Sequence, residues 1–125
     1  MLLNITDLSQ EPLQSQIARL VRAKILNGDL EAADSLPSIR ELARRNQVSV
    51  ITVQRAYESL VREGLIHARR GKGFFVADLK SESKRRMSLS RLKDELAPAV
   101  KVARHEGLTD EEIEKALREV LERED

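Results

Sequence analysis

The chain has 125 residues, 41% hydrophobic and 34% charged, with 22 lysines and arginines against 21 aspartates and glutamates. This length suits one small domain with an appendage, and the composition is typical of a folded protein. Because there is no cysteine, a disulfide framework and a thiolate metal site are excluded, and His67 and His105 are too far apart to form a local ligand pair. We expect no metal and no cofactor.

The sequence contains no pattern of export, membrane insertion or catalysis. Residues 1–10 lack a basic start and a long apolar run, and no later stretch approaches the roughly 20 apolar residues of a membrane span. A nucleophile–base constellation, a phosphate loop and a metal motif are likewise missing. We expect a cytoplasmic protein that is not an enzyme and has no membrane partner.

Three helices are predicted in the first half of the chain. The first begins with Pro12 in its first turn and ends at Gly28, and its buried stripe recurs every three or four residues: Leu13, Ile17, Leu20, Val21 and Ile25. The second begins at Ser38, which forms a capping box with Glu41. After a polar break at residues 46–47, the third helix follows a capping serine, Ser49, and runs to residue 63, with a glycine as its stop.

A hairpin is predicted directly after the third helix. The β-prone runs LIHAR and FFVA flank RGKG, whose glycines permit a tight turn. Two helices separated by a few residues make a helix-turn-helix candidate, and the added hairpin makes it a winged helix. The predicted fold class is therefore mainly α with a small β-hairpin, and residues 1–79 form the winged helix-turn-helix domain.

The remaining residues, 80–125, are predicted to form a helical pair. Residues 81–86 are a linker or the ragged start of a helix, followed by the apolar repeat Leu89, Leu92, Leu96, Val100 and Ala103, in which Pro98 threatens a kink. A second capping box, Thr109 and Glu112, starts a helix with the apolar positions Ile113, Ala116, Leu117, Val120 and Leu121. The pair is too small to close its own core, so these stripes must pack on the first domain or on another subunit.

These motifs resemble the GntR family of bacterial transcription regulators. The resemblance rests on PLQSQIARLVRAKILNGDL, LPSIRELARRNQVSVITVQRAYESLVREGLI and RRGKGFFVA, which arrive in the family's order between Pro12 and Ala77. The helical pair, including ARHEGLTDEEIEKAL, looks like the C-terminal region of the YtrA subfamily, which implies dimerisation without a large effector-binding domain. Ala33 stands where the family usually has glycine, and this suggests a different turn.

The third helix is expected to enter the major groove of DNA. Ser49 and Thr52 can bond phosphate or base edges, Gln54 can pair with adenine, Arg55 can meet phosphate or guanine, and Val50 and Ile51 can contact thymine methyl groups. The family often carries arginine at positions 50 and 54, so its base contacts do not carry over. The alternative is that Val50 packs on the turn after the second helix.

The second helix and the wing supply further candidate DNA contacts. The resemblance places a contact at Arg40 in the PSIR motif, and the predicted wing contacts are Arg70, Gly71 and Lys72. The alternative for Arg40 is a solvated arginine, and the alternative for the wing residues is a basic turn without a DNA contact. Lys84 to Arg86 is more simply a solvated face. The complete predicted set is Ser38, Arg40, Ser49, Val50, Ile51, Thr52, Gln54, Arg55, Arg70, Gly71 and Lys72.

The predicted function is sequence-specific DNA binding by a dimeric transcription regulator, a repressor on an inverted-repeat operator. Its partners are double-stranded operator DNA and a second copy, joined through Leu92, Leu96, Val100, Ile113, Leu117 and Leu121. The alternative function is a winged-helix module that docks proteins through Val50 and Ile51. The sequence names no operator and no small-molecule effector.

Overall fold

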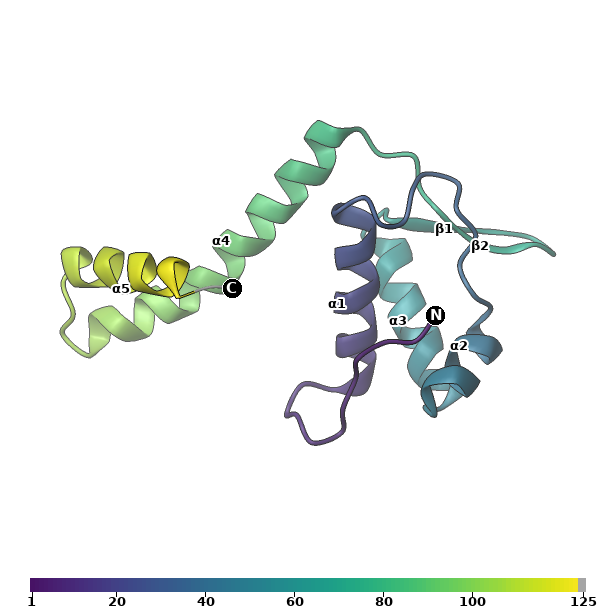
Figure 1. Cartoon of the computed structure of the whole chain (residues 1–125), viewed down its shortest axis with the longest axis horizontal. Helices are drawn as coiled ribbons and strands as arrows, with labels where there is room; N and C mark the ends of the chain where they lie inside the picture. The colour runs from purple at the N-terminus through teal and green to yellow at the C-terminus, as the bar shows by residue number, and fades with distance from the viewer. Residues whose placement is uncertain (124–125) are drawn as a thin grey trace. The chain divides into compact units, whose positions relative to one another are not determined.

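The computed structural model describes residues 1–123 (Figure 1). The described chain falls into two compact units, which divide between Lys84 and Arg85. The elements in chain order are α1 (Leu13–Leu26), α2 (Ile39–Asn46), α3 (Val50–Arg62), β1 (Ile66–Arg69), β2 (Gly73–Val76), α4 (Ser81–His105) and α5 (Asp110–Glu122). The predicted class, mainly α with one small hairpin, is confirmed. The units divide after Lys84, whereas the predicted functional boundary after residue 79 stays a prediction.

The core of the first unit lies between α1, α3 and the elements packed against α3. α1 and α3 lie side by side (Figure 1), and α2 and β1 also contact α3. The predicted α1 stripe is buried except at Leu13 and Leu20, which are only half-buried. Pro12, expected in the first turn, occupies the N-cap position just before it, without a capping side-chain hydrogen bond. The residues with no exposed surface include Ile17, Val21, Ile25, Leu42, Val53, Leu60 and Leu65.

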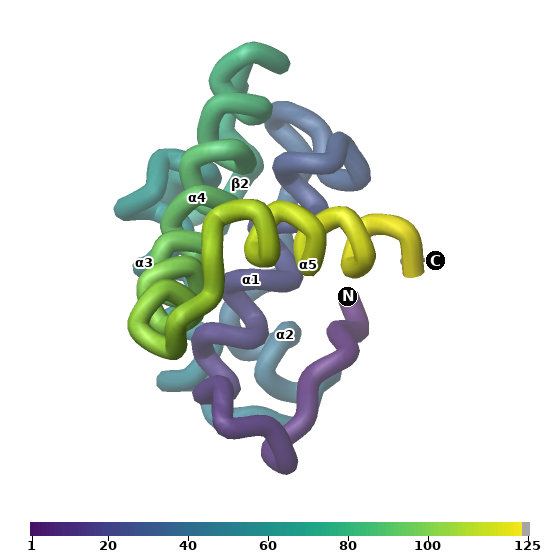
Figure 2. The backbone as a smooth tube through the Cα atoms, turned by 90° about the vertical axis from the view of Figure 1, so that its left-hand side faces the viewer, coloured from purple at the N-terminus to yellow at the C-terminus, as the bar shows by residue number. Residues whose placement is uncertain are grey.

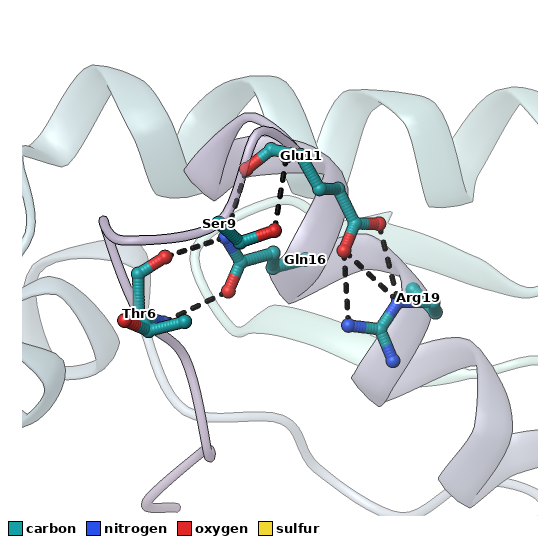
Figure 3. Close-up of polar contacts among 5 residues, drawn as sticks. All are labelled: Thr6, Ser9, Glu11, Gln16 and Arg19. Carbon is teal, nitrogen blue, oxygen red and sulfur yellow. Dashed lines mark hydrogen bonds and ion pairs between the residues drawn. The ribbon is translucent and has the colours of Figure 1, made fainter.

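The segment before α1 is held by two side-chain amides. Gln16, only 2% exposed, accepts a hydrogen bond from the Thr6 amide at 2.9 Å and donates to the carbonyls of Thr6 at 2.7 Å and Glu11 at 2.8 Å (Figure 3). Asn46, the last residue of α2, accepts from the Leu3 amide at 2.8 Å. This segment, for which the sequence predicted no helix or strand, is thus tied to both α1 and α2.

The helix-turn-helix follows its predicted capping serines. Ser38 accepts from the Glu41 amide at 3.1 Å, but only this half of the predicted capping box forms, because the Glu41 carboxylate lies 3.4 Å from the Arg45 guanidinium. At the end of α2, Gln47 has φ +54°, and the Val48 amide donates back to Ala43 at 3.0 Å. This tight stop turns the chain into α3.

The loop before α2 pairs with the hairpin. β1 and β2 are antiparallel, with Ile66 opposite Val76, and the Ala33 amide donates to the Val76 carbonyl at 2.9 Å. Ala33 has φ +70°, in the left-handed region that glycine adopts without strain. Alanine therefore stands here in a conformation that glycine adopts without strain, and the expectation of a turn different from the family's stays a prediction.

The second unit is a pair of helices. α4 is helical from Ser81, so the residues expected as a linker or a ragged start are its first turns, and α4 bends part-way along (Figure 1), as expected from Pro98 within it. The capping box of α5 is confirmed: Thr109 accepts from the Glu112 amide at 3.1 Å, and Glu112 accepts from the Thr109 amide at 2.9 Å. No described residue of either helix is buried.

Candidate nucleic-acid interface

The inner face of α3 anchors the helix in the unit. Val53, Ala56, Tyr57 and Leu60 are all buried, at the spacing of one helical stripe. The Tyr57 hydroxyl donates to the Pro37 carbonyl at 2.7 Å, and its ring meets Phe74 edge-on at 4.9 Å between centroids. Burial raises the pKa of this hydroxyl above its ordinary range. Tyr57 thus joins α3 both to the residue before Ser38 and to the hairpin.

The outer face of α3 presents the two aliphatic side chains singled out in the sequence. Val50 is 42% exposed and Ile51 is 50% exposed, while Gln54 and Arg55 are also exposed on later turns. This exposure of Val50 leaves room both for the predicted groove contact and for packing of the covered part on the preceding turn, so both stay predictions. An apolar contact with thymine methyl groups is therefore sterically open to both residues.

The serines and the threonine at the helix starts are already engaged in local hydrogen bonds. Ser49 accepts from the Thr52 amide at 3.1 Å, and its Oγ lies 2.7 Å from Thr52 Oγ1, with either able to donate. Ser38 caps α2 in the same way. A hydroxyl has one donor and two acceptor positions, so each retains capacity for at least one further partner. Their predicted contact with DNA stays a prediction.

The turn of the hairpin places the basic wing residues in solvent. The Lys72 amide donates to the Arg69 carbonyl at 2.9 Å, and Gly71 between them has φ +75°. A side chain at that position would be strained, which accounts for the glycine. Arg70, Gly71 and Lys72 are all exposed, so the two cations stand clear of the unit on a turn of fixed shape.

One cation beside the wing turn was missing from the predicted site. The Arg69 guanidinium lies over the Phe75 ring, 5.1 Å from its centroid, and the ring of His67 stacks on the same phenyl at 6.2 Å. His67 and Arg69 alternate along β1, so they share the face on which Phe75 lies. The alternation of residues along β1 predicts that His67 and Arg69 share a face, but the pairing register of the two strands was needed to place Phe75 beside Arg69.

The predicted DNA contacts gather on three parts of the first unit. Arg40 is exposed in the first turn of α2, and all the others except the half-buried Thr52 are exposed at the start of α2, along α3 and at the wing turn. In Figure 1, α2 and the hairpin turn lie on the opposite side of α3 from α1. The first turns of α2 and α3 and the wing therefore form an accessible surface away from α1.

The residues predicted for dimerisation lie on the second unit with much of their surface uncovered. Leu92 is 52% exposed, Leu117 45% and Leu121 65%, whereas Leu96, Val100 and Ile113 are half-buried. The structure thus leaves both predicted stripes without a packed core of their own. Within residues 1–123 there is no group of three or more side chains arranged to hold a metal ion. No helix of the described chain combines the length and apolar character needed to cross a membrane.

A helix-turn-helix whose second helix exposes its first turn beside a basic hairpin defines a winged-helix DNA-binding domain. Residues 13–76 match the model of the gntR family of bacterial regulatory proteins, which accounts for half of the chain. The chain belongs to this family, and it resembles the YtrA regulators within it.

The similarity to known proteins extends over nearly the whole chain. The HTH-type transcriptional repressor YtrA of Bacillus subtilis (strain 168) is 28% identical over 119 residues, 95% of this chain and 92% of that protein. A transcriptional antiterminator from Listeria monocytogenes EGD-e has a solved structure with a TM-score of 0.74 and 30% identity, covering 94% of this chain and 87% of that one.

The first unit is also similar to a domain solved on DNA. The DNA-binding domain AraR(DBD), in complex with operator ORX1, has a TM-score of 0.55 and 29% identity, covering 62% of this chain and 95% of that one. The fold of the first unit is thus one that binds operator DNA in a relative.

Proposed function

We propose that this chain is a homodimeric, cytoplasmic repressor of transcription that binds an inverted-repeat operator through α3 and the basic wing. The observation that carries the proposal is the joint exposure of the α3 first turn and of the wing cations Arg70 and Lys72. α3 is long enough to lie in a major groove, and the wing cations can neutralise neighbouring phosphates. The name of the YtrA relative supports repression, and the AraR complex supports operator binding.

In this proposal the cations hold the DNA backbone. Arg40→Ala, Arg70→Ala and Lys72→Ala should each weaken binding to all sequences alike and lower the slope of log affinity against log salt by roughly 0.9, since each removes one phosphate contact. The control is Arg62→Ala, which removes an exposed cation from the last turn of α3. Salt slopes that stay unchanged for all three variants would contradict the assignment and favour a protein-docking module.

Selection from random duplexes identifies the operator and tests the apolar contacts. We expect inverted repeats, with thymines where Val50 and Ile51 enter each half-site. Replacing thymine by uracil removes only the methyl group, so it should weaken wild-type binding and have less effect on Ile51→Ala. Val50→Arg should shift the selected half-sites toward guanine, the base that arginine pairs with best. Equal binding of the uracil and thymine operators would remove this role from the two residues.

Dimerisation through the second unit is the remaining part of the proposal. A chain shortened to residues 1–84 should stay folded, since these residues form a compact unit, but should sediment as a monomer. Its operator affinity should fall steeply because the two half-sites are no longer bound by linked domains. A shortened chain that dimerises as tightly as the full chain would place the interface in the first unit.

A further inference from the structure

α4 carries an open groove with a basic border. Its volume is about 480 Å³, and its lining comes from α4 alone: Lys93, Leu96, Ala97, Val100, Lys101, Arg104 and His105. The floor is apolar, and no carboxylate is among the lining residues. α4 as a whole has seven lysines and arginines against three acidic residues, a net charge of +4. The groove therefore fits an occupant that is both apolar and acidic.

α5 has the matching character. It carries six acidic residues against two basic ones, a net charge of −4. At about 100° per residue, its apolar stripe, from Ile113 to Leu121, is bordered by Glu114 on one side and Glu119 on the other. The two basic residues, Lys115 and Arg118, fall on the opposite face. The apolar face of α5 is thus framed by negative charge, as the groove is framed by positive charge.

The helix turn prevents α5 from filling the groove of its own chain. The Leu108 amide donates to the Ala103 carbonyl at 3.0 Å, and Arg104 pairs with Asp110 at 3.1 Å across the turn. From there α5 runs across the direction of α4 instead of along it (Figure 2), and neither helix buries a residue. The α4 groove and the apolar face of α5 are therefore both uncovered and can bind another molecule.

We propose that α5 of one copy docks in the α4 groove of a second copy, and that the second copy returns the same contact. Charge complementarity between the two helices of one sequence makes a second copy the fitting occupant, because each copy offers one basic groove and one acidic helix. A two-fold axis then repeats the contact and covers all four apolar faces at once. The inference rests on the homodimer proposed above and specifies which helix meets which.

Charge reversal in the 125-residue chain tests the pairing. One variant, Lys93→Glu with Lys101→Glu, makes the groove negative, and the other, Glu114→Lys with Glu119→Lys, makes the borders of α5 positive. Each variant alone should be largely monomeric in sedimentation, at least tenfold weaker in dimer affinity than wild type, because both of its contacts set like charges together. An equimolar mixture should regain a dimer containing one copy of each, in which both contacts are again of opposite charge.

The control carries the same charge change on the far face of α5, as Glu111→Lys with Glu122→Lys, and should dimerise nearly as wild type. Far-ultraviolet circular dichroism of every variant verifies that the helices form. Single variants that still dimerise, or a mixture that stays monomeric, would overturn the inference. A wild-type chain that is itself monomeric would overturn the proposed homodimer as well, whereas a wild-type dimer with failed complementation overturns only this pairing.

Cross-linking gives a second, charge-independent test, because the chain has no cysteine of its own. Ala97→Cys lies on the groove floor and Ala116→Cys within the α5 stripe. A short bismaleimide should link the mixed single-cysteine chains through residues 97 and 116 faster than it links either variant to itself. Faster linking of like residues would show that α4 meets α4 or α5 meets α5, and would overturn the proposal.

Discussion

Ala33→Gly should stabilise the first unit, because Ala33 has φ +70°. An L-residue with a Cβ in the left-handed region loses about 1–2 kcal/mol relative to glycine. Glycine also raises the entropy of the unfolded chain, and this lowers the stability by about 0.4–1 kcal/mol. The difference leaves a net gain of about 1 kcal/mol, or a rise in melting temperature of about 4–8 °C for a unit of this size. The hydrogen bond from the backbone amide of residue 33 to the Val76 carbonyl is kept in the variant.

Tyr57 provides an assay that sees only this unit. It is the sole tyrosine of a chain without tryptophan, and it is buried. Its near-ultraviolet circular dichroism therefore follows unfolding of the first unit in urea, and the midpoint should rise with an unchanged slope.

The matched control is the neighbouring Ala32→Gly. Ala32 is exposed, and Ala33 and Gln47 are the non-glycine residues with positive φ in the described chain. Glycine at position 32 therefore relieves no backbone strain, and the larger entropy of the unfolded chain should lower the stability by about 0.4–1 kcal/mol. Opposite signs at adjacent alanines are the expected result. A lower midpoint for Ala33→Gly, or equal shifts for both variants, would refute the account of the turn.

Three further predictions follow from individual contacts. Burial raises the pKa of Tyr57, so phenolate absorbance should be absent near pH 10 until the protein unfolds. The free energy of unfolding should fall as pH rises above 10, because only the unfolded chain loses the proton there, and Tyr57→Phe should remove that share of the pH dependence. The Glu63 carboxylate lies 2.7 Å from the mostly buried guanidinium of Arg22, so Glu63→Gln should leave that charge poorly paired and cost about 2 kcal/mol in urea titrations. Glu11→Gln, in the exposed pair that Glu11 makes with Arg19 at 3.0 Å, should cost less than about 1 kcal/mol, and equal costs for the two variants would contradict this. Thr109→Ala should lower the α5 helicity measured by circular dichroism and cost about 1 kcal/mol, because it removes the N-cap oxygen, whereas Thr109→Ser should stay close to wild type. An unchanged spectrum for Thr109→Ala would show that the cap does not stabilise α5.

Local chemistry let the sequence determine most of the elements. Capping side chains act within three residues of their own position, so Ser38, Ser49 and Thr109 marked the helix starts that the structure has. Apolar periodicity separated the buried face of α3 from Val50 and Ile51 for the same reason, since 3.6 residues per turn fixes which side chains share a face. The ordered set of motifs was also enough to name the family, which the comparisons confirm.

Tertiary structure alone decided the contacts between distant segments. The sequence does not say that Gln16 holds the segment before α1, that Phe75 lies beneath Arg69, or that Glu41 leaves the Ser38 amide for Arg45. The sequence offers each of these side chains several chemically similar partners, and the register of a strand or the packing of a helix decides which one lies close enough to bind. The sequence likewise supplies a basic α4 and an acidic α5, but only the turn at residues 106–109 directs α5 away from its own groove.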